Sequence, residues 1–208
     1  MKFLHIIIAL FFLAFPIYSL QLTTTINPGD SLIVDSNISL AEALKGNNIP
    51  GNIKQTLTII DVYYYSFDGK LHKGQVVVNK ILVNDIHQIF SIIKERKFPV
   101  EKVKPISTYG WDDDLSMKDN NTSAFNYRKV KGTKTLSAHA LGKAIDINPL
   151  LNPQIKREKV FPAGAAYNPK RNGTITGNSF LVKEFKKRGW RWGGTWRSTK
   201  DYQHFEKK

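Results

Sequence analysis

The sequence predicts an α+β domain with a small, mainly antiparallel sheet flanked by helices. Three observations lead to this class. The stretches 56–66 and 72–78 have strand composition and are joined by a turn at Asp68-Gly69. Two later stretches repeat apolar residues at helical spacing. Strands and helices do not follow one another in a βαβ rhythm, which would have indicated a parallel, doubly wound sheet.

Residues 1–20 have the pattern of a secretory signal peptide. One lysine precedes a nearly unbroken apolar run that ends near the small residue Ser19. An uncleaved N-terminal anchor is the alternative. The remainder, 21–208, is long enough for a single domain with its own core, and we expect a monomer. We therefore expect an exported protein that is periplasmic, associated with the cell wall or extracellular.

The composition limits the partners of this domain. The chain carries a formal net charge of +14 and no cysteine, so an exported domain must be held together by its core or by a metal. A positive surface attracts polyanions, which outside a bacterial membrane are wall polymers and phospholipid surfaces. We find no zinc-finger spacing, RNA-binding signature or basic heptad helix, and we expect no nucleic-acid partner. Solubility alone is the other explanation of the charge.

The first half of the chain contains two predicted helices. Ser39 and Glu42 form a capping box for a short helix over 39–46. Apolar residues recur every three or four positions over 80–96, which predicts an amphipathic helix. The stretch after Pro99 is expected to be extended.

The second half mixes loops with a strand and a helix. We expect 109–128 to be an ordered acidic loop that ends in a short strand, and 143–148 to be a strand. The stretch 149–178 is rich in Pro, Asn and Gly and is predicted to be a long loop. A helix is expected over 179–190, ended by Gly189.

The stretch SAHALGKAIDINP, 137–149, contains a candidate metal site. On a strand, Ile145 and Ile147 face one side while Asp146 faces the other. Gly142 allows a sharp bend that can return His139 toward Asp146. An imidazole and a carboxylate that meet in this way can provide two zinc ligands. A His–Asp pair that only stabilises a loop is the alternative.

A third ligand would favour the metal, and His204 is the best candidate. A site with two histidines and one aspartate leaves a zinc position open for water, as catalytic sites do. A nearby carboxylate could then accept the proton of that water. Asp201 can do so only if the chain turns between 201 and 204, whereas Glu206 shares a strand face with His204. Spacing alone leaves both carboxylates open for this role.

The pattern SAHALGKAIDIN resembles the S-x-H-x-x-G-x-A-x-D motif of the zinc DD-peptidases. The C-terminal GWRWGGTWRSTKDYQHFE is also similar to theirs, and the resemblance is strongest over 105–206. This family includes D-alanyl-D-alanine carboxypeptidases and dipeptidases and phage L-alanyl-D-glutamate endopeptidases. The resemblance implies a Zn²⁺ ion on His139, Asp146 and His204.

The same resemblance assigns roles to two further residues. It makes Asp201 the catalytic acid, three residues before the last ligand. FNYR resembles the segment that bears a family arginine, so Arg128 is expected to bind substrate or stabilise the oxyanion. Alternatively, Arg128 simply neutralises one of the nearby aspartates. Some family members have glutamate where Asp201 stands, and the aspartate is similar to the endopeptidase subgroup.

The resemblance implies an exported zinc metallopeptidase that hydrolyses the peptide stems of bacterial peptidoglycan. Carboxypeptidases and endopeptidases share the ligand set, so both activities remain open. The alternative from another class is a non-catalytic, zinc-stabilised module that binds the cell wall.

Overall fold

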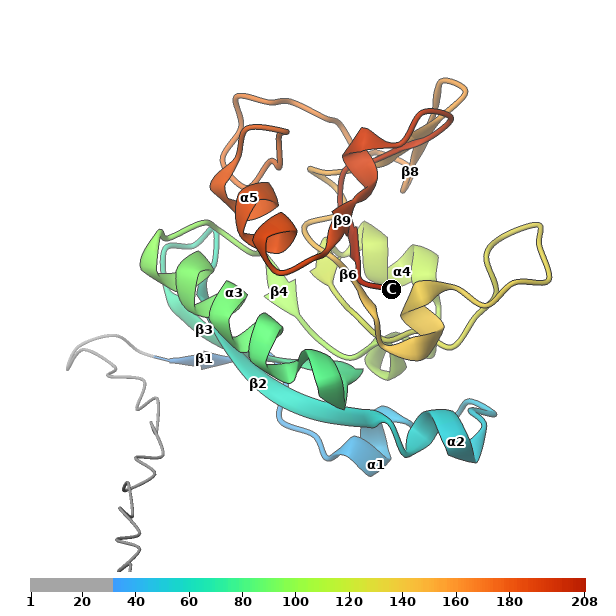
Figure 1. The fold of residues 1–208 in the computed structure, drawn as a ribbon. Coiled ribbons are helices and arrows are strands. Elements are labelled where there is room, and N and C mark those ends of the chain that lie inside the picture. The colour runs from blue at the N-terminus through green and yellow to red at the C-terminus, as the bar shows by residue number, and fades with distance from the viewer. Residues whose placement is uncertain (1–31) are drawn as a thin grey trace, which may run out of the picture.

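The computed structural model describes residues 32–208, and the fold is shown in Figure 1. The predicted signal peptide, 1–20, lies outside the described residues. Within the described part, helices and small sheets are mixed, which confirms the α+β prediction. No helix in residues 32–208 combines the length and the apolar character needed to cross a membrane.

A long hairpin forms one side of the domain. Strands β2 (Leu57–Tyr65) and β3 (Leu71–Asn79) pair antiparallel along their whole length, and β1 (Ile33–Val34) adds to β3 in parallel. The predicted strands and their turn are confirmed. Helix α3 (Val83–Glu95) follows a short 3₁₀ turn, η1 (Lys80–Leu82), and crosses the hairpin in Figure 1.

The main core lies between this hairpin and the C-terminal half of the chain. The apolar face of α3 is fully buried and consists of Ile86, Ile89, Phe90 and Ile93. Helix α5 (Phe180–Lys187) packs against the same core, and Ser179 caps it through the N–H of Val182. Apolar spacing therefore predicted both helices correctly, because burial of one face is what stabilises an amphipathic helix.

A smaller cluster lies under the N-terminal helices. Helix α1 (Leu40–Ala43) has the predicted capping box, in which Ser39 and Glu42 bond each other's backbone N–H. Helix α2 (Gly51–Lys54) follows directly. Both contribute to a second apolar cluster around Leu57 and Phe125.

The sheet that carries the candidate site is small and antiparallel. Its strand order is β6-β11-β9, formed by β6 (Ala144–Asp146), β11 (His204–Glu206) and β9 (Arg191–Trp192). Ile145 and Ile147 are fully buried in the main core, as the strand alternation predicted. Asp146 therefore lies on the opposite side of β6.

The acidic stretch 109–128 is not the predicted loop. It contains helix α4 (Asp113–Lys118), which starts at Asp112, whose side chain accepts the N–H of Leu115. Acidic residues in the first turn of a helix are stabilised by the helix dipole, so the run of aspartates favours a helix start here. A 3₁₀ turn, η2 (Ile106–Tyr109), precedes it, and β5 (Asn121–Thr122) pairs in parallel with β4 (Lys102–Val103).

The stretch 149–178 was also predicted wrongly as an uninterrupted loop. It contains a hairpin of β7 (Gln154–Lys156) and β8 (Lys159–Phe161), and β7 also pairs with β10 (Lys200–Asp201). The two turn residues, Arg157 and Glu158, have φ angles of 46° and 67°. Such a turn is ordinarily marked by Asn or Gly, so its sequence carried no hairpin signal.

Candidate metal centre

Three side chains from distant parts of the sequence converge on one point. His139 Nε2 lies 3.1 Å from His204 Nδ1 and 3.2 Å from Asp146 Oδ2. His204 Nδ1 lies 2.9 Å from Asp146 Oδ1. All three residues are buried, with 3–8% of their surface exposed. The structure thus brings together the three residues that the sequence proposed as ligands.

Backbone pairing places two of these side chains opposite each other. His204 on β11 and Asp146 on β6 are Cα partners in an antiparallel ladder, and directly opposed side chains in such a ladder are close neighbours. His139 lies on a 3₁₀ turn, η3 (Ala138–Leu141), and the hydroxyl of Ser137, the N-cap of this turn, accepts the N–H of His139.

Gly142 makes the bend that brings this turn back to β6. Its φ is +64°, and a Cβ there would lie 2.6 Å from the backbone nitrogen of Asn79. The bend predicted at this glycine is therefore present, and it requires a residue without a side chain.

Outer hydrogen bonds fix the orientation of both imidazoles. His139 Nδ1 lies 2.5 Å from the carbonyl oxygen of Ala124, so it must be the protonated ring nitrogen. His204 Nε2 lies 3.5 Å from Glu206 Oε2. A proton on each outer nitrogen leaves His139 Nε2 and His204 Nδ1 as lone-pair donors that face inward, as metal-binding histidines require.

The charges of the group are strongly coupled. Burial alone would raise the pKa of Asp146, but His139 and His204 hold it well below its usual range. Burial disfavours the charged form of His204, yet hydrogen bonds to Asp146 and Glu206 raise its pKa to about 10 in the metal-free chain. The hydrogen bond to His204 lowers the pKa of Glu206 to about 2. The imidazole of His204 is therefore protonated at neutral pH in the metal-free chain.

The donor set fits Zn²⁺. Two imidazole nitrogens and one carboxylate are typical zinc ligands, and ligands at about 2.1 Å in a tetrahedron lie roughly 3.4 Å apart. The two imidazole nitrogens lie 3.1 Å apart, close to this value, and one donor atom from each of the three residues lies within 4.8 Å of the others. Three protein ligands leave one tetrahedral position open, which distinguishes catalytic from structural zinc sites.

Asp201 lies beside the group but does not belong to it. The chain bends at Tyr202 and Gln203, between β10 and β11, which is the turn that Asp201 needed to reach the site. Asp201 is 6% exposed. Burial raises its pKa, the charge of Asp146 raises it further, and His204 opposes this shift. The carboxyl group is thus electrostatically linked to the ligands and prefers to hold a proton more than an ordinary aspartate does.

Glu206, the other carboxylate open for the proton-transfer role, has a different environment. It is hydrogen bonded to His204 and forms an ion pair with Arg191. These contacts keep it charged and orient the ring of His204, so it lies behind a ligand rather than in front of the metal position.

Two further residues of the C-terminal segment GWRWGGTWRSTKDYQHFE pack at the site. Gly193 begins a 3₁₀ turn, η4 (Gly193–Thr195), and a Cβ there would lie 2.6 Å from the carbonyl oxygen of Asp201. The indole of Trp196 lies 5.2 Å from the ring of His204, measured between centroids. Both contacts lie within the C-terminal segment that resembles the zinc DD-peptidases, but the sequence did not predict which of its residues would touch each other.

Arg128 lies at the edge of the site. Its backbone oxygen accepts the N–H of Ser137, two residues before His139. Its guanidinium forms an ion pair of 3.0 Å with Asp113, whose other oxygen accepts a hydrogen bond from Asn126. The aspartate that Arg128 neutralises is thus Asp113. Binding of substrate by Arg128 stays a prediction.

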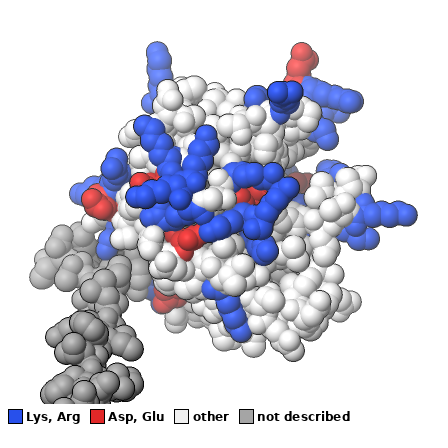
Figure 2. Space-filling view, in the orientation of Figure 1, with Lys and Arg blue, Asp and Glu red and all other residues white. Residues whose placement is uncertain are grey.

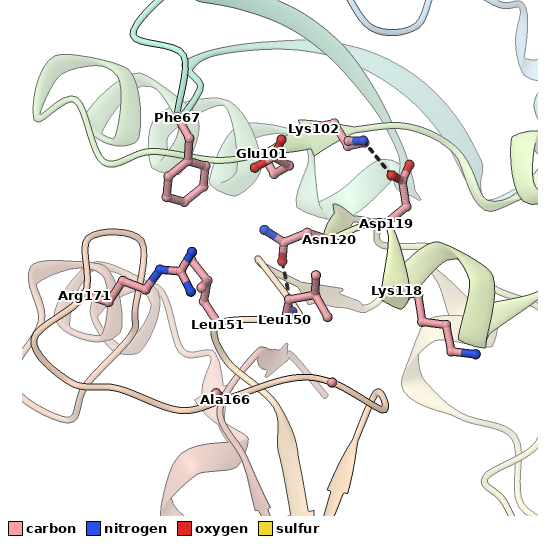
Figure 3. A pocket seen from close by; sticks show the side chains of 11 residues that line it. Phe67, Glu101, Lys102, Lys118, Asp119, Asn120, Leu150, Leu151, Ala166 and Arg171 are labelled. Atoms are coloured by element: carbon pink, nitrogen blue, oxygen red, sulfur yellow. Dashed lines mark hydrogen bonds and ion pairs between the residues drawn. The ribbon is translucent and has the colours of Figure 1, made fainter.

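A pocket of about 430 Å³ lies elsewhere, and none of the three converging residues lines it. Figure 3 shows Arg171 and Phe67 on one side and the ion pair of Lys102 with Asp119 on the other. Asn120 and Leu150 also line the pocket, and the side-chain oxygen of Asn120 accepts the N–H of Leu150 at 2.9 Å. The lining of this pocket thus contains charges of both signs.

A buried His-Asp-His group with one open position and a carboxyl group beside it is typical of metallopeptidases. Residues 131–207 match a family model described as D-alanyl-D-alanine carboxypeptidase. The matched segment contains the three converging residues and Asp201. No curated protein and no solved structure matches the chain. Residues 131–207 are thus similar to this peptidase family, and the similarity supports a metallopeptidase that acts on D-Ala-D-Ala or related peptidoglycan stems.

Proposed function

We propose that this protein is an exported zinc metallopeptidase that hydrolyses the peptide stems of peptidoglycan. His139 Nε2, His204 Nδ1 and a carboxylate oxygen of Asp146 would hold the ion. The observation that carries the proposal is the convergence of one donor atom from each residue, all within 4.8 Å of one another, with both imidazoles oriented by outer hydrogen bonds.

Two residues of the chain have the remaining roles in the proposed reaction, proton transfer and substrate binding. Zn²⁺ bound there would acidify a water ligand and polarise the scissile carbonyl. Asp201 accepts the proton from the attacking water and returns it to the leaving amine, a role suited to a carboxyl group whose pKa is raised by burial. Arg128 holds a carboxylate of the substrate or the developing oxyanion, because a guanidinium fork matches either group.

Two scissile bonds suit this machinery. One is the terminal D-Ala-D-Ala bond, which the description of the matching family names. The other is the L-Ala-D-Glu bond, which the resemblance of the Asp201 pattern to the endopeptidase subgroup favours. Both substrates are peptides of the wall, and a monomer is sufficient because every proposed ligand comes from one chain.

The surface charge is consistent with a location at the wall. Figure 2 shows Lys and Arg side chains gathered over α5 and the adjacent part of α3. Such a surface would attract anionic wall polymers and keep the enzyme near its substrate. The protein would then act outside the cytoplasmic membrane, with no nucleic-acid partner.

The direct test is mass spectrometry of purified muropeptides after incubation with zinc-loaded protein, with a chelated sample as control. Zinc-dependent loss of a terminal D-alanine would identify a carboxypeptidase. A cut between L-alanine and D-glutamate would identify an endopeptidase. No zinc-dependent product on any stem length would contradict the proposal and favour the non-catalytic wall-binding module.

A further inference from the structure

We infer that Gln154 is a positioning residue for Asp201: it binds one carboxylate oxygen and leaves the other free for proton transfer. This inference rests on the proposed function, in which Asp201 moves the proton. Gln154 lies in the β7–β8 hairpin, in a region that the sequence presented only as a loop.

The contact between the two side chains is short and partly buried. Gln154 Nε2 lies 2.7 Å from Asp201 Oδ2. An ionised carboxylate only accepts hydrogen bonds, so the amide nitrogen of Gln154 must face it. The two residues are also Cα partners in the antiparallel pair of β7 with β10.

The two carboxylate oxygens of Asp201 differ in their hydrogen bonding. Oδ2 is held by Gln154, whereas Oδ1 is buried and has no hydrogen-bond partner among residues 32–208. A buried polar atom without a partner is costly and in a native structure requires an explanation. Presentation of this oxygen to the attacking water and the leaving amine is that explanation.

The chemical type of the residue at position 154 suits this role. A glutamine is neutral, so it orients the carboxylate without the strong stabilisation of the charged form that a lysine or arginine would provide. Asp201 thereby keeps the proton affinity that a group needs to accept and return a proton.

The backbone around the pair is fixed on both sides. The N–H of Tyr202 donates to the carbonyl oxygen of Pro153 at 3.2 Å. On the other side, Lys200 pairs with Ile155. Gly193 packs directly against the main chain of Asp201. Gln154 therefore has little freedom to move away from the carboxylate, and the hairpin acts as a rigid support.

The test uses two variants of zinc-loaded, full-length protein. Gln154→Leu keeps most of the side-chain volume and removes the donor, and Gln154→Ala guards against a packing effect of the leucine. The matched control is Lys156→Leu, which changes an exposed residue of the same strand. The measurements are kcat and KM on the stem peptide cleaved by the unaltered protein, zinc content and the midpoint of thermal unfolding.

We expect kcat to fall about 10–100-fold in both variants, the usual effect of losing a contact that orients a catalytic group. KM, zinc content and the unfolding midpoint should stay near those of the unaltered protein, and the control should keep its full kcat. A kcat within twofold in both variants would overturn the inference, as would a fall in kcat that is matched by loss of zinc or of thermal stability. If the unaltered protein cleaves no stem peptide, the proposed function fails first and the inference with it.

Discussion

His204 and Asp146 face each other across neighbouring antiparallel strands, with Nδ1 of the imidazole 2.9 Å from a carboxylate oxygen. The other ring nitrogen of His204 faces Glu206, two residues further along the same strand. One strand thus provides both a ligand and the group that orients it, because residues i and i+2 share a face of a strand.

This relationship predicts that Glu206 contributes to metal affinity. Glu206→Ala removes the acceptor that keeps the proton on Nε2 of His204, and we expect zinc affinity to fall about 10–100-fold. Competition with a chromophoric chelator measures the change. Glu158→Ala alters an exposed acid in the hairpin turn and should leave affinity unchanged. Equal affinities in all three proteins would show that Glu206 does not support the ligand.

Zinc binding should be coupled to the release of a proton from His204. Its pKa in the metal-free chain is about 10, so below that pH zinc must displace a proton. Affinity should therefore rise with pH through the neutral range and level off only near pH 10, by up to about tenfold per unit for one displaced proton. Titration calorimetry in buffers of different ionisation enthalpy measures the released proton. Affinity independent of pH between 6 and 8 would contradict this prediction.

Asp201 should be essential for turnover and dispensable for the metal. Asp201→Asn keeps the shape of the side chain and removes its capacity to accept a proton, and we expect kcat to fall roughly 10²–10⁴-fold. Zinc content, measured by atomic absorption, should remain one ion per chain. Normal turnover in this variant would remove Asp201 from the mechanism, whereas loss of zinc would make it a ligand.

Comparison of two variants can distinguish substrate binding by Arg128 from a purely structural ion pair with Asp113. If Arg128 binds substrate, Arg128→Ala should raise KM or lower kcat by about tenfold or more. Asp113→Ala, which removes the 3.0 Å ion pair and the hydrogen bond from Asn126, should keep activity within a few-fold. Steady-state kinetics on the identified stem peptide decides between them. Equal losses in both variants would favour the simpler role, in which the pair only orders the loop before Ser137.

Gly193 is expected to tolerate no side chain. A Cβ at this position would lie 2.6 Å from the carbonyl oxygen of Asp201 and 2.8 Å from its Cβ. Gly193→Ala should therefore destabilise the fold by about 1–3 kcal/mol and displace Asp201. Gly51→Ala is the control, because a Cβ at Gly51 meets no atom within 4 Å. Chemical denaturation measures both, and unchanged stability in Gly193→Ala would show that the turn can move freely.

Local patterns predicted those elements that depend on local interactions. The capping box of Ser39 and Glu42, the turn at Asp68-Gly69 and the apolar face of α3 all appear where the sequence placed them. The β7–β8 hairpin was missed because Arg157 and Glu158 occupy positions where glycine or asparagine is usual. Helix α4 was missed because three consecutive aspartates look like a loop unless the first of them is recognised as a cap.

The sequence by itself predicted which three side chains converge in the fold. His139, Gly142 and Asp146 lie within eight residues, so their spacing on a bend and a strand can be recognised without any tertiary information. His204 was the best candidate for a third ligand, and only the resemblance to the zinc DD-peptidases favoured Asp201 over Glu206.

Only the tertiary structure decided how these groups are supported. Gln154 binds Asp201 from 47 residues away, the carbonyl of Ala124 orients His139, and Gly193 packs on the main chain of Asp201. Each of these contacts depends on strand pairing or close packing between segments that are distant in sequence. A hydrogen bond or a van der Waals contact of this kind leaves no periodicity in either segment, so only the folded chain contains the information.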